Sequence, residues 1–158
     1  MDPGTEEPRS GLYFEDFLIG RVFETSEREI SFQDITDFAD LTGDHNPLHT
    51  DPEYCKDTPF GVPIAHGLLV FGVFTGLYHG LGIFSGTALA FLEIADWKFR
   101  KAVFVDDRVR GRITITAKDR TSNPMRGIVK RRCEILNQRD EVVQQGETKV
   151  LVQCRTSG

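Results

Sequence analysis

The apolar stretch from Gly67 to Leu81 constrains the fold of this chain more than any other segment. Its apolar residues fall on every side of a helix, so no polar face is left for water. A helix of this kind is expected to be buried. Gly72 and Gly76, one turn apart, each cost roughly 1 kcal/mol against alanine, which indicates that backbone or a partner element packs closely there. The run is too short to span a bilayer.

The chain changes character after this helix and reads as long strands. Four segments are rich in Val, Ile, Thr and Phe, and turn residues separate them. An earlier segment has a similar but weaker pattern and predicts one further strand. We expect the four later segments to form consecutive hairpins of an antiparallel sheet. The predicted strands are 21–30, 87–99, 109–118, 127–136 and 142–154.

These elements predict an α+β fold in which about five antiparallel strands wrap around one long buried helix. The sheet must curve, because a flat sheet would leave the far side of the helix in water. Such a wrap leaves a sheet edge or a helix end exposed, so a homodimer, or a higher oligomer, is expected. The length of 158 residues fits one domain over residues 12–158, after a polar, flexible tail over residues 1–11.

Composition narrows the partners and the compartment. The net charge of -5 argues against nucleic acid or an anionic membrane surface as the main partner. Cys55, Cys133 and Cys154 are odd in number and lack the spacing of a zinc site, which is typical of reduced thiols. The acidic start of the chain is unlike a signal peptide. A cytoplasmic protein is expected.

A second, shorter helix is predicted over residues 31–42, and a loop follows it. Ser31 is a good N-cap, and Asp34 three residues later places a carboxylate at the positive end of the helix. Gly43 is expected to end the helix, and Pro47 to prevent its resumption. Asp44, Asn46 and His49 therefore fall in a tight loop.

Three segments of the chain carry a family resemblance. They are FADLTGDHNPLHTDP at 38–52, FGVPIAHGLL at 60–69 and WKFRKAVFVDD at 97–107. With the order of elements, they resemble the MaoC-like dehydratases of the hot-dog fold, which include the (R)-specific enoyl-CoA hydratases. Asp106 stands where the family usually has glycine, a departure that affects a turn.

The resemblance implies roles for five residues. Asp44 and His49 would activate the water that adds across a trans-2-enoyl thioester, and Asn46 would orient them. The Gly67 amide would bind the thioester oxygen as part of an oxyanion hole. Thr75 falls where the family often has a small hydroxyl residue near the site. Apart from the resemblance, His66 is either a structural helix-cap residue or part of the substrate tunnel, which Phe71, Phe74, Phe84 and residues 54–60 are expected to line.

Elementary chemistry supports the same roles for the pair of Asp44 and His49 and for the Gly67 amide. Adding water to a conjugated thioester needs a base, an acid and a donor for the oxygen on which negative charge develops. A carboxylate and an imidazole can each move protons, and Asp44 at a helix end would be partly desolvated. Which of Asp44 and His49 is the base stays open. The helix start at Gly67 offers free amides and a partial positive charge.

Structural alternatives exist for each feature. Asp, Asn and Pro favour turns, so the loop after Gly43 could be only a helix-ending turn. A threonine on a buried helix often bonds back to the preceding turn, which is an equal alternative for Thr75. Several basic residues could form a cationic rim for a CoA or carrier-protein phosphate, although most would simply be solvated: Lys98, Arg100, Lys101, Arg126, Lys130, Arg131 and Arg132.

The expected function is a hydro-lyase of fatty acid metabolism that interconverts enoyl-CoA and 3-hydroxyacyl-CoA. The substrate is an acyl-CoA or an acyl-carrier protein thioester, and no metal or other cofactor is expected. Two alternatives remain: an acyl-CoA thioesterase, and a non-catalytic subunit that binds acyl thioesters.

Overall fold

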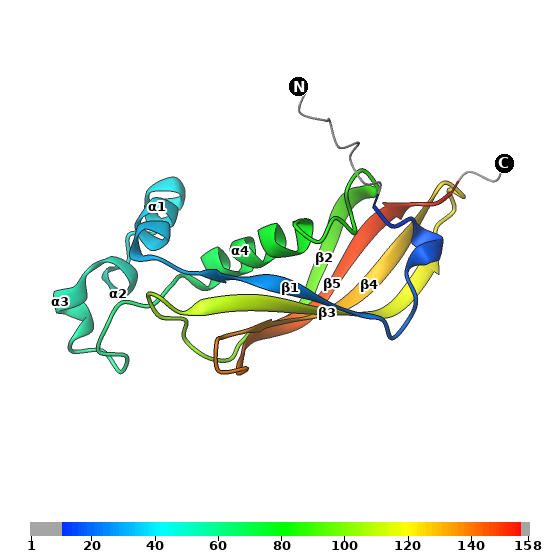
Figure 1. Ribbon diagram of the computed structural model, residues 1–158. Coiled ribbons are helices and arrows are strands. Elements are labelled where there is room, and N and C mark those ends of the chain that lie inside the picture. The colour runs from blue at the N-terminus through cyan, green and yellow to red at the C-terminus, as the bar shows by residue number, and fades with distance from the viewer. Residues whose placement is uncertain (1–10, 156–158) are drawn as a thin grey trace, which may run out of the picture.

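The computed structural model describes residues 11–155 and contains one five-stranded sheet with four helices and a 3-10 turn (Figure 1). Residues 1–10 of the predicted tail lie outside the described residues, whereas Gly11 donates a backbone hydrogen bond to Ser85. The elements are the turn η1 Phe14–Asp16, β1 Val22–Glu29, α1 Phe32–Thr42, α2 Pro47–Thr50, α3 Pro52–Cys55, α4 Gly67–His79, β2 Ala88–Phe99, β3 Arg108–Arg120, β4 Arg126–Leu136 and β5 Val142–Gln153.

The sheet is antiparallel throughout, with the strand order β1-β3-β4-β5-β2. The predicted hairpins are confirmed for β3 with β4 and for β4 with β5. The prediction is wrong for β2, which pairs with β5 at the opposite edge and leaves β1 beside β3. The physical reason is the connection between β2 and β3, residues 100–107, which is too long for a tight hairpin. Within this connection, Phe104 forms an isolated bridge with Ile64.

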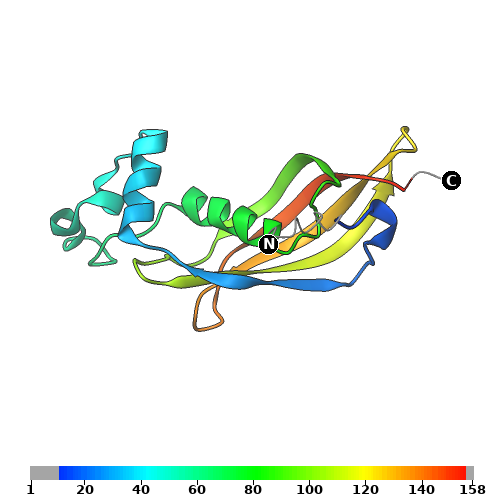
Figure 2. The same cartoon turned by 45° about the horizontal axis from the view of Figure 1, so that its top comes forward.

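Helix α4 lies along one face of the curved sheet, as both views show (Figures 1 and 2). Its buried residues Leu69, Val70 and Phe74 join the core formed by the inward residues of the strands. The opposite face is open in the single chain: Leu68 is 65% exposed, and a Cβ added at Gly72 or Gly76 would meet no neighbour. The expected burial of α4 is therefore met on one side only.

Helix α1 follows the sequence prediction closely. The Ser31 hydroxyl accepts a hydrogen bond from the Asp34 amide, and the Asp34 carboxylate accepts one from the Ser31 amide. Gly43 ends the helix with a φ of 78°, a left-handed conformation that glycine adopts without strain. Together with α2 and α3, α1 forms a segment that extends beyond one end of the sheet (Figure 1).

Two further expectations concern the membrane and the cysteines. Across residues 11–155, no helix is long and apolar enough to cross a membrane. Cys55, Cys133 and Cys154 are all buried and unpaired, as the sequence predicted for reduced thiols. Burial raises the pKa of the Cys133 thiol, which belongs to the core on β4 and contacts Thr148.

Candidate active site

The loop after α1 is more regular than the sequence predicted. Pro47 does not simply break the chain but occupies the first position of α2, where its missing amide is no loss. The side chain of Asn46 caps this turn by accepting a hydrogen bond from the Leu48 amide, 3.0 Å away. The backbone amide of Asn46 also donates a hydrogen bond to the Asp44 carboxylate, 3.3 Å away. Asn46 thus organises the turn that carries His49.

His49 is held from a second, distant segment. Its Nδ1 lies 2.7 Å from the backbone oxygen of Ile64, and the Ile64 amide donates to the backbone oxygen of Leu48 at 3.3 Å. A carbonyl oxygen can only accept, so Nδ1 carries the proton. In neutral His49 the free lone pair is therefore on Nε2, the nitrogen that can take a proton from a bound water.

His66 lies beneath this loop and is almost completely buried. Its Nε2 donates to the backbone oxygen of Asp44 at 3.0 Å, while its ring stacks on His49 with centroids 3.9 Å apart and contacts Phe38 at 4.9 Å. Its Nδ1 is buried and has no hydrogen-bond partner among the described residues. These contacts indicate that His66 supports the loop that carries Asp44 and His49.

The structure brings Asp44, His49 and His66 together. One ligand-type atom of each lies within 4.8 Å of the others, a grouping that the sequence pattern did not suggest as a metal site. The donor set could hold an ion, but its geometry favours this poorly. His49 Nδ1 and His66 Nε2 each donate to a backbone oxygen, so neither of these nitrogens has a lone pair to offer an ion.

His49 and Gly67 line the same cavity, of about 490 Å³, at the start of α4. As the first residue of α4, Gly67 has an amide with no partner inside the helix. Its neighbour on the other side is Phe99, whose ring occupies the space that a Cβ at position 67 would need. The remaining lining residues are largely apolar: Phe60, Ile64, Ala65, Leu68, Val70, Ala102 and Val103.

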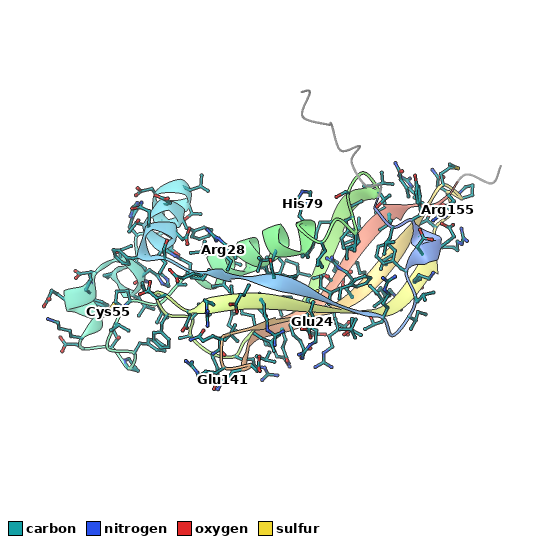
Figure 3. All side chains as sticks on the ribbon, in the orientation of Figure 1. Glu24, Arg28, Cys55, His79, Glu141 and Arg155 are labelled. Atoms are coloured by element: carbon teal, nitrogen blue, oxygen red, sulfur yellow. The ribbon has the colours of Figure 1, made fainter. Side chains whose placement is uncertain are left out.

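Several predicted features of the site are placed differently, and Asp44, Phe71, Phe74 and Phe84 are not among the residues that line this cavity. The Asp44 side chain is 55% exposed, so in the single chain it is less desolvated than expected. Thr75 is not brought to the cavity, and its hydroxyl donates to the backbone oxygen of Gly72 at 2.6 Å. It lies toward the end of α4 that Figure 3 marks with His79, which corresponds to the structural alternative.

Sequence reasoning missed Gln144 on β5. This side chain is buried at the cavity wall, and its Nε2 donates to the backbone oxygen of Gly67 at 2.9 Å. No local pattern signals it, because the register irregularity near Leu136 disturbs the alternation of β5. Of the basic residues considered, Arg100 and Lys101 reach the cavity wall, where Lys101 pairs with Glu141 at 2.5 Å.

The comparison with protein families matches residues 16–134 to the MaoC like domain. The chain belongs to the MaoC-like family. The resemblance predicted from the motifs is thereby confirmed, and the wrapped five-stranded sheet is the hot-dog fold expected with it. In this MaoC-like chain the candidate site lies between the segment formed by α1, α2 and α3 and the start of α4.

Two curated relatives and one solved structure show the extent of the similarity. A 3-hydroxybutyryl-CoA dehydratase of Methylorubrum extorquens is 44% identical over 42% of this chain and 41% of its own length. An (R)-specific enoyl-CoA hydratase of Aeromonas caviae is 35% identical over 63% of this chain and 71% of its own. The structure of a monoamine oxidase regulatory protein from Archaeoglobus fulgidus has a TM-score of 0.87 and 34% identity, covering 94% of this chain and 99% of that one. The match to the first relative thus spans less than half of that protein.

Proposed function

We propose that this MaoC-like protein is a hydro-lyase that adds water to trans-2-enoyl thioesters, or removes it from (R)-3-hydroxyacyl thioesters. The observation that carries the proposal is the shared cavity. Its lining includes His49, with Nε2 as the proton-accepting nitrogen, and Gly67, whose backbone amide has no partner within residues 11–155. Names of relatives that act as hydratases and dehydratases support the same reaction class.

The chemistry follows from these positions. A thioester oxygen at the Gly67 amide gains a hydrogen-bond donor and the positive end of the α4 dipole, which stabilise the charge that develops there. Water between Asp44 and His49 loses a proton to one of them and adds through oxygen to the β-carbon. The α-carbon then takes a proton from a group of the site. The enoyl double bond thereby becomes a single bond, and the β-carbon carries the new hydroxyl group.

The test is hydration of crotonyl-CoA, followed by loss of the conjugated absorbance. Asp44→Asn and His49→Ala are each expected to reduce kcat by roughly 10²- to 10⁴-fold. Asp40→Asn and His45→Ala are matched controls, because Asp40 and His45 form an exposed pair 3.5 Å apart and neither belongs to the group of Asp44, His49 and His66. Activity that survives in both site variants overturns the proton-transfer roles.

Two further measurements separate the other functions. Release of free thiol without loss of enoyl absorbance would identify a thioesterase, and binding of CoA esters without turnover would identify a non-catalytic subunit. A chelator is expected to leave the rate unchanged. A loss of activity that added zinc restores would instead assign a metal to the Asp44, His49 and His66 group.

The proposed substrate is a CoA or carrier-protein thioester whose phosphates contact Arg100 and Lys101 at the cavity. Of these two cations, Lys101 is engaged by Glu141, whereas Arg100 forms no ion pair with any described residue. Arg100 is therefore the better placed to meet a phosphate. Arg100→Ala is expected to raise KM for CoA esters more than it lowers kcat.

A homodimer is proposed to cover the open side of this site. Strand β2 is a sheet edge, and its apolar residues Leu89, Phe91, Leu92 and Ile94 are all exposed in the single chain. An exposed apolar edge of this length is an aggregation hazard unless another chain pairs with it. The open face of α4 includes Leu68, which lines the cavity together with Phe99 at the end of β2, so a second copy here would also close the cavity.

A further inference from the structure

Gln144 connects the central sheet to the start of α4 through a buried amide. Its Nε2 donates to the backbone oxygen of Gly67 at 2.9 Å, and its Oε1 accepts from the indole nitrogen of Trp97 at 3.0 Å. One partner can only accept and the other can only donate, so the orientation of the amide is determined by its contacts. At 2% exposure, Gln144 has little access to water as a substitute partner.

Gly67 needs such a restraint. The Phe99 ring occupies the space that a Cβ would need at this position, so any larger residue would require this exposed ring to shift. Glycine also has the most backbone freedom, which works against a precise placement of the amides at the helix start. A hydrogen bond to the Gly67 carbonyl limits this freedom and polarises the peptide that it shares with the amide of Leu68, the next unpaired donor of α4.

We propose that Gln144 is a positioning residue that fixes the Gly67 backbone through its carbonyl, and thereby holds the Gly67 amide in place for the thioester oxygen, and that Trp97 orients Gln144. The proposal rests on the proposed function of Gly67 as an oxyanion donor. Gln144 acts through Gly67 and need not touch the reacting atoms. Its predicted effect is therefore on kcat, because a misplaced donor stabilises the transition state less while the rest of the substrate still binds.

The diagnostic variant is Gln144→Glu, which keeps the size of the side chain. An ionised carboxylate cannot donate to the Gly67 oxygen, whereas a protonated carboxyl can. We expect burial and the facing Gly67 carbonyl, which disfavour the charged form, to outweigh the Trp97 indole donor, which favours it, and so to raise the pKa of this carboxyl. The ratio of kcat in the variant to kcat in the parent is expected to fall as pH rises, and Gln144→Leu is expected to lose about tenfold in kcat at every pH.

The matched control is Gln145→Glu, the same substitution one residue along β5. Gln145 lies in a groove lined by Lys98 and Arg132 and does not line the cavity. It is expected to leave kcat and its pH profile unchanged. Trp97→Phe, which removes the indole donor and keeps an aromatic ring, is expected to lower kcat in the same direction as Gln144→Leu and by less. A pH-independent ratio for Gln144→Glu, or a change in KM alone, overturns the proposal.

A second readout does not depend on turnover. The infrared carbonyl stretch of bound butyryl-CoA is expected to lie at lower frequency in the parent than in solution, and to move back toward the solution value in Gln144→Leu. If the parent protein binds butyryl-CoA with this shift but hydrates no enoyl-CoA, the proposed function is overturned. The role of Gln144 in positioning Gly67 is then still supported. A shift that is the same in parent and variant, or no binding of the thioester, overturns the positioning role.

Discussion

The imidazole rings of His49 and His66 stack with centroids 3.9 Å apart, while His66 Nε2 donates to the backbone oxygen of Asp44. One buried side chain thus contacts both members of the proposed proton-transfer pair. The stack sets the ring plane of His49, and the hydrogen bond sets the turn that carries the Asp44 carboxylate. His66 is a support for the pair in this arrangement and has no need to reach the substrate.

His66→Phe tests this relationship, because phenylalanine keeps an aromatic ring under His49 and loses the hydrogen bond to Asp44. We expect kcat for crotonyl-CoA to fall about tenfold, corresponding to one lost hydrogen bond. Thermal unfolding is expected to change little, since the substitution also removes the buried, unpartnered Nδ1. Parent-like kcat in a folded variant would show that the bond to Asp44 does not matter for the reaction.

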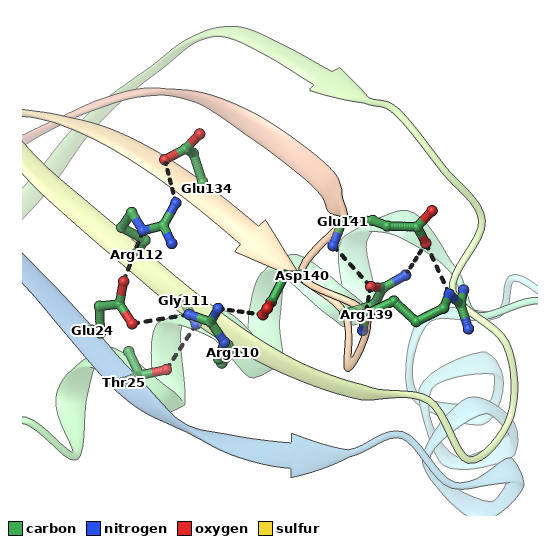
Figure 4. Close-up of polar contacts among 10 residues, drawn as sticks. Glu24, Thr25, Arg110, Gly111, Arg112, Glu134, Arg139, Asp140 and Glu141 are labelled. Atoms are coloured by element: carbon green, nitrogen blue, oxygen red, sulfur yellow. Dashed lines mark hydrogen bonds and ion pairs between the residues drawn. The ribbon is translucent and has the colours of Figure 1, made fainter.

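The Glu141 carboxylate is expected to make part of the free energy of unfolding depend on pH in the acid range. This carboxylate accepts hydrogen bonds from Asn137, Lys101 and Arg139, which lower its pKa from 4.5 to about 2. Figure 4 shows the contact with Arg139. A folded-state pKa below the unfolded one means that the contribution is fully present above about pH 5 and is lost as pH falls toward 2.

Glu141→Gln is therefore expected to lower the urea midpoint of unfolding at pH 7. The gap between variant and parent is expected to narrow steadily as the pH is lowered to 3, because the parent carboxylate becomes protonated in the unfolded chain first. The two midpoints are measured at matched ionic strength, since the exposed ion pairs of Glu141 are screened by salt. A gap that stays constant with pH would refute the assignment.

Arg131 is a fully buried cation in the core of the sheet. Its Nε donates to the Thr148 hydroxyl at 3.0 Å, but Nη1 and Nη2 have no hydrogen-bond partner within residues 11–155. The guanidinium instead lies 4.8 to 5.8 Å from the ring centroids of Tyr78, Phe84 and Phe91. Cation–π contacts offset part of the desolvation cost, at about 2 kcal/mol for a desolvated pair.

Arg131→Met, which keeps most of the volume without the charge, is expected to raise the free energy of unfolding by about 1–4 kcal/mol, as replacement of buried charges by apolar side chains often does. Arg131→Ala is expected to lower it by about 2–5 kcal/mol through the cavity that it leaves. Chemical denaturation of both variants measures the two effects. If methionine destabilises as strongly as alanine, the aromatic contacts outweigh the buried charge.

Ile94 on the edge strand β2 tests the proposed dimer. Ile94→Glu would place a charge where the second copy is expected to pair, so the variant is expected to sediment as a monomer while the parent sediments as a dimer. Leu41→Glu is the control, because Leu41 on α1 is an exposed apolar residue, at 84%, away from this edge. A parent protein that is monomeric at micromolar concentration would refute the dimer, as would an Ile94→Glu variant that stays dimeric.

The local parts of the fold were accessible from sequence. Ser31 and Asp34 predicted the start of α1, and Gly43 predicted its end, because a capping box and a left-handed glycine involve residues only a few positions apart. The strand boundaries followed from composition and turn residues for the same reason. At the site, the spacing of Asp44, His49 and Gly67 identified three groups that the structure places around one end of α4.

Other features depended on contacts between distant residues. The pairing of β2 with β5 could not be read from strand patterns, since any two strands with apolar faces can satisfy them. Pro47 was read as a helix breaker, although the same fixed φ suits the first position of α2 once Asn46 caps it. The sequence leaves Thr75 open between a role near the site and a hydroxyl bonded to the preceding turn, and only the folded helix shows the bond to Gly72.

The sequence by itself determined the order and type of the elements, the family, and the loop and helix start on which the proposed chemistry depends. These are set by periodicity, caps and turns, which act over short separations along the chain. The tertiary structure decided which nitrogen of His49 carries the proton, how His66 supports the loop, and that Gln144 meets Gly67. Those features arise when residues as far apart as 77 positions are brought together by the pairing of strands and the packing of α4 on the sheet. No local pattern encodes such contacts, because their free energy comes from burial that exists only in the folded chain.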